Sequence, residues 1–157
     1  MSSKFPNASP KIMSINIRGG HTKKCKYLLL IKQAMEEGIS VIKCQETHSH
    51  DVHEIAKYLA HLDNITVFES INTSNPNKGG VAIISLDKSL NLRLISKDSE
   101  ALIPGTVGHN WTETMTQFER DSVELDSING KWIVCRITWD KKEIHLANIY
   151  VTTHNQL

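Results

Sequence analysis

The first 46 residues carry the patterns of a strand, a helix and a second strand, in that order. Residues 11–19 read as a short apolar strand running into a turn, residues 23–37 as an amphipathic helix, and residues 39–44 as a buried β-branched strand. Parallel strands that are joined by a helical crossover have their carboxyl ends at one edge of the sheet. We therefore expect Asn16 and Glu46, which stand where the two strands end, to lie close together.

The predicted helix has a clear start, face and end. Thr22 can cap its start, and Gly38 supplies the left-handed conformation with which helices commonly end. Between them, apolar residues recur at steps of three and four and therefore share one face. These residues are Tyr27, Leu28, Leu30, Ile31, Ala34 and Met35.

A second amphipathic helix is predicted shortly after Glu46. Asp51 and Glu54 have the spacing of a capping box, which marks the start of a helix. The apolar residues from this point again recur at helical intervals. They are Val52, Ile55, Ala56, Leu59 and Leu62.

The rest of the chain alternates between strand and turn signals. Residues 72–80 and 140–142 are predicted turns, and Asn129-Gly130 favours the type I′ turn of a tight hairpin between the strands on either side of it. Residues 97–119 show no clear period and are expected to form a long surface loop. The strands are expected at residues 65–68, 81–84, 90–95, 122–128, 132–139 and 143–150, the last with Ile144, Leu146 and Ile149 as its apolar positions. Two early helices and many later strands favour an α/β sandwich over a helical bundle or a doubly wound sheet.

Composition indicates a single domain in a reducing compartment. The 157 residues include 18 basic and 17 acidic side chains, and a net charge of +1 creates no overall field that attracts nucleic acid. Cys25, Cys44 and Cys135 lack the paired spacing of a zinc site or disulfide framework, so we expect free thiols in an intracellular protein, nuclear or cytoplasmic. No secretory signal or apolar run of about 18 residues is present. We expect a flexible leader at residues 1–10 and one domain at residues 11–157.

Four short elements occur in an order and spacing typical of one family. They are Ser-Ile-Asn at residues 14–16, Val-Ile-Lys-Cys-Gln-Glu-Thr-His at 41–48, Lys-Gly-Gly-Val-Ala-Ile at 78–83 and Ala-Asn-Ile-Tyr at 147–150. With them the chain resembles the endonuclease/exonuclease/phosphatase superfamily, and most closely the amino-terminal part of the apurinic-type endonuclease domain of non-LTR retrotransposons. The resemblance implies an α/β fold of the DNase I-like type, a four-layer α-β-β-α sandwich, here truncated at the carboxyl end.

The resemblance also implies a catalytic site made by Asn16, Glu46 and Tyr150. In that family the residue matching Glu46 holds a divalent cation, Mg²⁺ or possibly Mn²⁺, and one carboxylate with waters and a substrate phosphate is enough to hold such an ion. The residue matching Asn16 positions the phosphate, and the phenol matching Tyr150 contacts it. Taken alone, Glu46 reads more readily as a solvated glutamate that closes a strand. Asn16 alone can be read as a turn asparagine, and Tyr150 as a strand aromatic packed on the core. Where the family usually has proline after the tyrosine, this chain has Thr152.

The implied function is magnesium-dependent cleavage of DNA. The sequence contains neither the Asp-any-Asn nor the Ser-Asp-His motif that the family places downstream, so we expect little or no activity from the isolated chain. An incomplete second sheet would favour self-association. Two alternatives stay open: a phosphatase for a phosphorylated small molecule or lipid, and a non-catalytic binding remnant. His48, His50 and His53 are expected to form a polar helix entry rather than a metal cluster, and Lys78-Gly-Gly80 a turn rather than a P-loop.

Overall fold

The computed structural model describes residues 9–19, 22–95 and 130–150, which form two helices and seven strands. The elements in chain order are β1 (Ile12–Asn16), α1 (Lys23–Glu36), β2 (Val41–Gln45), α2 (Glu54–Tyr58), β3 (Thr66–Ser70), β4 (Val81–Ser85), β5 (Asn91–Ile95), β6 (Trp132–Trp139) and β7 (Lys142–Ile149). Every predicted helix and strand within the described residues is therefore present, although several ends are shifted.

The amino-terminal strands build a four-stranded sheet in the order β1-β2-β4-β3. β1 and β2 are parallel and adjacent, with Asn16 opposite Gln45, and α1 connects them. The remaining pairs of this sheet, β2 with β4 and β4 with β3, are antiparallel. The strand, helix, strand order predicted from the sequence is thus confirmed, and it places the ends of β1 and β2 side by side.

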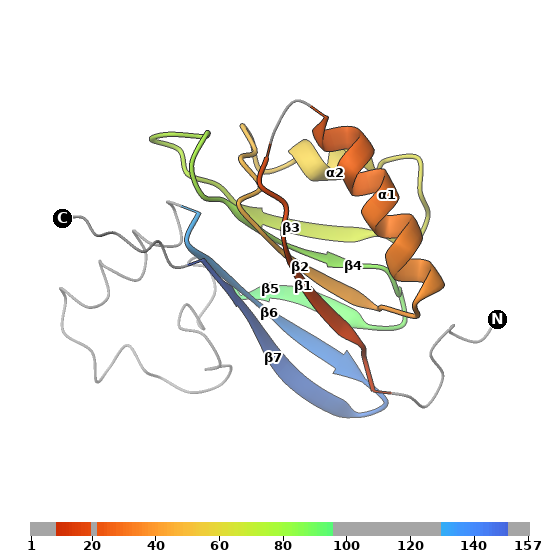
Figure 1. The fold of residues 1–157 in the computed structure, drawn as a ribbon. Helices are drawn as coiled ribbons and strands as arrows, with labels where there is room; N and C mark the ends of the chain where they lie inside the picture. Colours follow the sequence, from red (N-terminus) through yellow and green to blue (C-terminus); the bar gives the residue numbers. More distant parts are fainter. Residues whose placement is uncertain (1–8, 20–21, 96–129, 151–157) are drawn as a thin grey trace, which may run out of the picture.

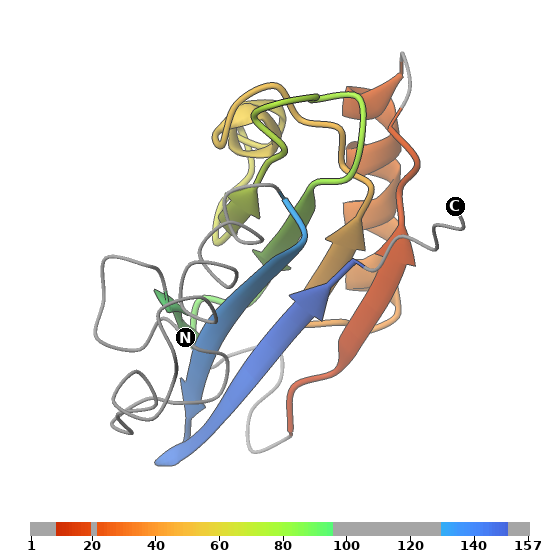
Figure 2. The ribbon, with the colours of Figure 1, turned by 90° about the vertical axis from the view of Figure 1, so that its left-hand side faces the viewer.

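The three later strands form an antiparallel sheet in the order β5-β6-β7, which packs against the first sheet (Figures 1 and 2). Both helices cover the opposite face of the four-stranded sheet (Figure 1). The predicted α/β sandwich of two sheets is therefore confirmed. Within the described residues the layers are helices, sheet and sheet, and no helix described here covers the outer face of the second sheet.

β2 and β4 are buried on both faces because they lie between the helices and the second sheet. Ile42 and Ile84 pack in the core beneath the helices, whereas Val41 and Ile83 pack in the core between the sheets. All four side chains are fully buried. This position explains why both strands read as continuous apolar runs instead of alternating patterns.

The predicted apolar face of α1 is confirmed, but its predicted cap is not. Tyr27 and Ala34 are among its fully buried residues, and Gly38 after the helix has a φ of 75°, the left-handed conformation expected there. Thr22 occupies the N-cap position without forming a side-chain capping hydrogen bond. The capping role predicted for Thr22 is therefore wrong.

The second helix, α2, is shorter than its sequence pattern predicts. Oδ1 of Asp51 accepts a hydrogen bond from the backbone N–H of His53 at 2.7 Å, which forms a local turn ahead of the helix. The predicted capping box does not form, and Val52 is 45% exposed. Ile55 and Leu59 are buried as predicted. The local Asx turn competes with the helix for these backbone groups and delays its start.

The turn between β6 and β7 lies where residues 140–142 predict it. Asp140 and Lys141 have φ values of 44° and 62°, so both central residues are left-handed as in a type I′ turn. The strand expected to pair with β6 through Asn129-Gly130, at residues 122–128, lies outside the described residues, and β6 pairs with β5 and β7. Of the apolar positions of β7, Leu146 is buried between the sheets, whereas Ile149 is 57% exposed.

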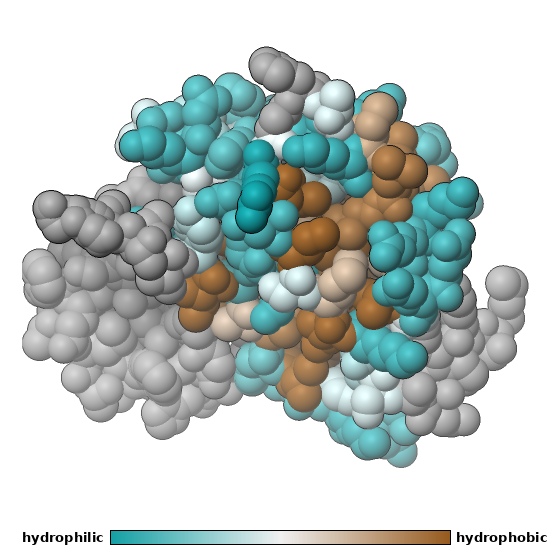
Figure 3. Space-filling view, viewed as in Figure 1, coloured by the Kyte–Doolittle hydropathy of each residue, from teal (hydrophilic) through white to brown (hydrophobic). Residues whose placement is uncertain are grey.

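Apolar side chains gather on the face of the molecule that carries the edge strands β1 and β7 (Figure 3). Ile12 on β1 and Ile149 on β7 are among the exposed large apolar residues. The three cysteines are free thiols, with Cys44 and Cys135 buried in strands. No helix in the described ranges is long and apolar enough to span a membrane. The predicted loop at residues 97–119 and residues 1–8 of the predicted leader lie outside those ranges.

Candidate functional site

Asn16 and Glu46 lie at neighbouring strand ends, as their places in the sequence predict. Beyond the paired residues, Ile17 donates a backbone hydrogen bond to the carbonyl of Gln45 at 2.9 Å, and Gly19 donates one to the carbonyl of Glu46 at 3.0 Å. These bonds continue the contact between the two chain segments past the end of the sheet. The side chain of Asn16 lies near enough to the carboxylate of Glu46 to lower the pKa of that group.

Tyr150 reaches the same carboxylate from the second sheet. Its hydroxyl donates a hydrogen bond to Oε1 of Glu46 at 2.6 Å, and its backbone N–H donates to the carbonyl of Lys131 at 2.7 Å. A separation of 2.6 Å is typical of a charge-assisted bond between a hydroxyl and a carboxylate. The structure therefore brings together the three residues Asn16, Glu46 and Tyr150, which lie far apart in the sequence.

The surroundings of Glu46 favour its charged form. The hydrogen bond from Tyr150 lowers the pKa of Glu46 and outweighs the opposing effect of partial burial. The nearby amide of Asn16 and the charge of Arg18 lower the pKa of Glu46 further. The same hydrogen bond raises the pKa of Tyr150, so its phenol stays protonated and acts as a donor. At neutral pH this site presents one ionised carboxylate.

One ionised carboxylate is a suitable donor for a small, hard divalent cation. Mg²⁺ prefers oxygen ligands and is commonly held by one or two carboxylates with waters and substrate phosphate, rather than by an all-protein cage. In the described part of the chain no group of three or more His, Cys, Asp or Glu side chains could hold a metal ion. The donor set at Glu46 therefore fits Mg²⁺ or Mn²⁺ better than Zn²⁺, which takes three or four nitrogen and sulfur ligands.

The backbone turns sharply at Glu46 and is enclosed by glycines. Glu46 and His48 have φ values of 54° and 51°, a conformation that side chains other than glycine seldom adopt. A Cβ at Gly19 would collide with the imidazole of His48, and one at Gly80 would collide with the hydroxyl of Thr47. Left-handed residues of this kind cluster at functional sites because the surrounding structure must hold them in place.

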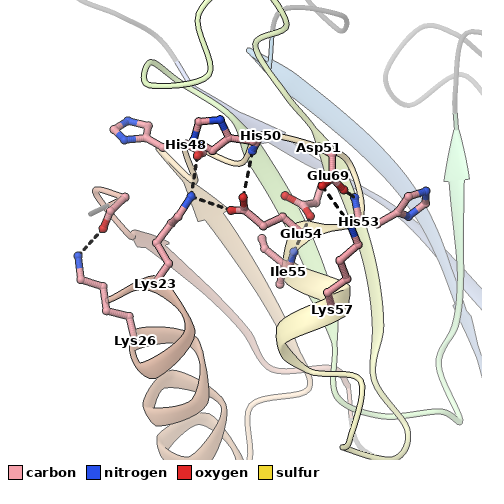
Figure 4. Close-up of polar contacts among 11 residues, drawn as sticks. Lys23, Lys26, His48, His50, Asp51, His53, Glu54, Ile55, Lys57 and Glu69 are labelled. Carbon is pink, nitrogen blue, oxygen red and sulfur yellow. Dashed lines mark hydrogen bonds and ion pairs between the residues drawn. The ribbon is translucent and has the colours of Figure 1, made fainter. Parts of the chain in front are cut away.

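A buried ion pair fixes the loop that follows Glu46 (Figure 4). Nζ of Lys23, at the start of α1, lies 2.7 Å from Oε2 of Glu54 and donates to the carbonyl of His48 at 2.8 Å. Oε1 of Glu54 accepts from the backbone N–H of His50 at 3.2 Å. The two charged side chains are only 12% and 14% exposed. Sequence analysis missed this pair because residues 23 and 54 have no shared motif or spacing.

A second carboxylate, Glu69 on β3, is half-buried beneath the same loop. Its Oε2 accepts a hydrogen bond from the backbone N–H of Ile55 at 2.9 Å, and Oε1 has no hydrogen-bond partner. Burial raises the pKa of Glu69 to about 7. The nearby hydroxyl of Ser49 and the Ile55 amide favour the charged form and oppose this effect. Alternation along β3 turns Glu69 toward the helices, away from Tyr150 and the other sheet.

The three histidines after Glu46 do not converge on one point. The imidazole of His48 lies against Gly19, and burial lowers the pKa of His48. Figure 4 shows His53 on the far side of Glu54 from His48. His50 and His53 are exposed. The arrangement is that of polar side chains around the entry to α2.

The described fold is similar to solved endonuclease structures, although no model of a protein family and no curated protein matches the sequence. The endonuclease domain of TRAS1, a telomere-specific non-LTR retrotransposon, matches with a TM-score of 0.52 and 14% identity over 92% of this chain and 47% of that one. AP endonuclease LMAP from Leishmania major matches with a TM-score of 0.55 and 17% identity over 91% of this chain and 40% of that one. The APE2 catalytic domain from Xenopus laevis matches with a TM-score of 0.56 and 17% identity over 92% of this chain and 46% of that one.

The similarity concerns the fold, because 14% to 17% identity is too low to carry an activity from one protein to another. This chain spans less than half the length of each of these three chains. The chain therefore has a fold similar to that of two AP endonucleases and of a retrotransposon endonuclease domain, the DNase I-like α/β sandwich.

Proposed function

We propose that this chain carries the cation-binding part of a metal-dependent phosphodiesterase site whose substrate is DNA. The single observation that carries the proposal is the convergence of Tyr150 and Asn16 on the carboxylate of Glu46. Both neighbours favour the ionised carboxylate, and the hydrogen bond from Tyr150 fixes its orientation. An ordinary solvated glutamate at the end of a strand would have neither partner.

Each of the three residues has a distinct role in this proposal. Glu46 would hold Mg²⁺ or Mn²⁺, and a bound cation would neutralise charge on the phosphate. Tyr150 holds the carboxylate in place through its hydroxyl and stands where a phenol can also donate to a phosphate oxygen. Oδ1 of Asn16 accepts from the backbone N–H of Arg18 at 3.0 Å, which fixes the amide at the rim of the site.

DNA is the proposed substrate because the similar structures are endonucleases, among them the endonuclease domain of a telomere-specific retrotransposon. We further propose that the 157 residues alone cleave DNA very slowly. The sequence contains no Asp-any-Asn and no Ser-Asp-His motif to supply a water-orienting group and a second phosphate donor. Such groups act as a unit, so the loss of several lowers the rate by orders of magnitude.

Cation binding tests the proposal without requiring turnover. We expect Mn²⁺ to bind the purified chain with one site by calorimetry, and Glu46→Gln to remove that binding while the thermal melt is retained. Glu36→Gln, on an exposed residue at the end of α1, is the matched control and should bind as the wild type does. Binding that survives Glu46→Gln would contradict the proposal. If the wild type cleaved supercoiled DNA rapidly and Glu46→Gln did not, the proposed site at Glu46 would be supported. The same result would refute the proposal that the 157 residues alone cleave DNA very slowly.

A further inference from the structure

A second polar contact joins the two sheets directly beside the bond between Glu46 and Tyr150. Gln45 immediately precedes Glu46, and its Nε2 donates a hydrogen bond to Oδ1 of Asn148 at 2.7 Å. Asn148 precedes Tyr150 by two residues, so the two side chains leave the same face of the chain. Gln45 and Glu46, at the end of β2, are therefore each hydrogen-bonded to a side chain at the end of β7.

The amide of Asn148 is fully used by its partners. Its Nδ2 donates to the carbonyl of Cys44 on β2 at 2.8 Å and to the carbonyl of Ala82 on β4 at 2.7 Å. The side chain is 1% exposed, so water cannot replace a lost partner. Its orientation is also determined, because the nitrogen faces two carbonyls and the oxygen faces an amide nitrogen. Asn148 thus binds both central strands of the first sheet from β7.

This contact can fix the register between the sheets in a way that the apolar core cannot. Apolar burial between sheets is non-directional and changes little when one sheet slides slightly over the other. A shift by one residue along a strand is about 3.3 Å, which would break every bond of Asn148 and carry the hydroxyl of Tyr150 away from Glu46. Another polar bridge between β2 and β7, from Nζ of Lys43 to the carbonyl of Ala147, is longer at 3.4 Å and comes from a flexible side chain.

We propose that Asn148 and Gln45 are positioning residues that set the place of the Tyr150 hydroxyl against the Glu46 carboxylate. The geometric part of this proposal stands on the hydrogen bonds alone. Its consequence for cation binding rests on the proposed function. Partners that orient a metal ligand are worth about tenfold or more in metal affinity.

The test compares Asn148→Ala and Gln45→Ala with two matched controls. Ile149→Ala changes the neighbouring residue on the opposite, exposed face of β7. Ser14→Ala removes the other side-chain partner of Gln45, whose Nε2 lies 3.0 Å from Oγ of Ser14. The Raman doublet of tyrosine reports phenol hydrogen bonding, and subtraction of a Tyr150→Phe spectrum isolates the contribution of Tyr150. Calorimetry with Mn²⁺ and a thermal melt complete the set.

We expect Asn148→Ala and Gln45→Ala to shift the Tyr150 doublet from that of a strong donor to that of a hydrated phenol, and to weaken Mn²⁺ binding about tenfold. Both controls should leave the two signals unchanged. Asn148→Ala removes the side-chain donor to two carbonyls, a loss that can prevent folding. In that case Gln45→Ala tests the proposal, because Gln45 is only half-buried at a strand end. An unchanged Tyr150 doublet in folded Gln45→Ala would overturn the proposal. If wild-type protein binds no Mn²⁺, the proposed function fails, and the doublet still decides the positioning role.

Discussion

At the scale of single residues, the candidate site depends on one bond between groups that the sequence separates by 104 positions. The hydroxyl of Tyr150 and the carboxylate of Glu46 are 2.6 Å apart. Each residue could be singled out from a short motif, but the bond between them requires the second sheet to be in place. The electrostatic state of Glu46 is therefore a property of the assembled sandwich.

Removing that hydroxyl should raise the pKa of Glu46. In Tyr150→Phe the carboxylate loses the largest cause of its lowered pKa, while burial still opposes the charge. The wild-type bond stabilises the fold above the ordinary pKa of a glutamate, and this contribution is lost as the pH falls through the folded value. Carboxyl NMR titration should show a higher Glu46 pKa in Tyr150→Phe and no change in Tyr58→Phe. Equal pKa values in wild type and Tyr150→Phe would refute the assignment.

Glu69 should make stability fall as the pH rises toward neutral. Its pKa is raised from 4.5 to about 7, so between these values the folded state keeps a proton that the unfolded state has lost. Stability from this group is fully present below pH 4.5 and is lost as the pH rises through about 7. The shift corresponds to about 3 kcal/mol.

Chemical denaturation across that pH window checks the prediction. The difference in unfolding free energy between wild type and Glu69→Gln should change by an amount of this order, and Glu36→Gln should show no such change. A constant difference between wild type and Glu69→Gln would exclude a raised pKa at this position.

At the scale of elements, the sequence predicts which helices and strands are present better than it predicts the residues at which they begin and end. α1 could be read from its apolar spacing because a single buried face dictates that spacing. α2 could not be read accurately, because the Asx turn at Asp51 uses backbone groups that the capping box would need. The apolar residues of β7 do not all face the same side, because alternation along the strand places Leu146 against the other sheet and Ile149 in solvent.

The buried pair of Lys23 and Glu54 should contribute more stability than an exposed pair of the same kind. Lys23→Met leaves the Glu54 carboxylate buried with only the His50 amide as a partner, and we expect a loss of about 3 kcal/mol in the free energy of unfolding. Lys57→Met is the matched control, because the pair of Lys57 with Asp51 has side chains 70% and 49% exposed. Urea denaturation should show a much smaller loss for Lys57→Met. Equal losses in the two variants would mean that burial of the first pair is unimportant.

The turn between β6 and β7 is a place where the chain can be stabilised. Lys141 has a φ of 62°, and a side chain at such a position costs about 1 kcal/mol relative to glycine. We expect Lys141→Gly to raise the free energy of unfolding by that order of magnitude. Lys131→Gly, which lies outside the left-handed positions, should not stabilise the protein. A melting temperature that does not rise in Lys141→Gly would show that the left-handed conformation of Lys141 costs the folded state little free energy.

At the scale of the whole molecule, the sandwich could be predicted because both of its cores are written into the strands. Continuous apolar runs in β2 and β4 require cover on both faces, and here the helices cover one face and the second sheet covers the other. The pairing order could not be predicted, because β4 inserts between β2 and β3 although β3 precedes it in the chain. Sequence order alone does not determine such an insertion.

The exposed edge of β1 predicts concentration-dependent association. Ile12 and Ile149 are exposed on edge strands of the two sheets, and unpaired edges with apolar side chains favour contact between chains. Sedimentation velocity should show a dimer or larger species that grows with protein concentration. Ile12→Lys should weaken it, because a charged side chain on an edge opposes pairing, whereas Lys24→Ala on the exposed face of α1 should not. A wild-type monomer at every concentration would contradict the prediction.

The glycines around the Glu46 segment have a consequence for how the protein tolerates change. Gly19 and Gly80 leave no volume for even a methyl group, since His48 and Thr47 already fill the adjacent space. The backbone at these two glycines is also left-handed, with φ values of 52° and 91°, so a side chain at either position would be strained even if His48 or Thr47 moved aside. Random substitutions should therefore be tolerated less well at Gly19 and Gly80 than exchanges between similar apolar side chains in the two cores.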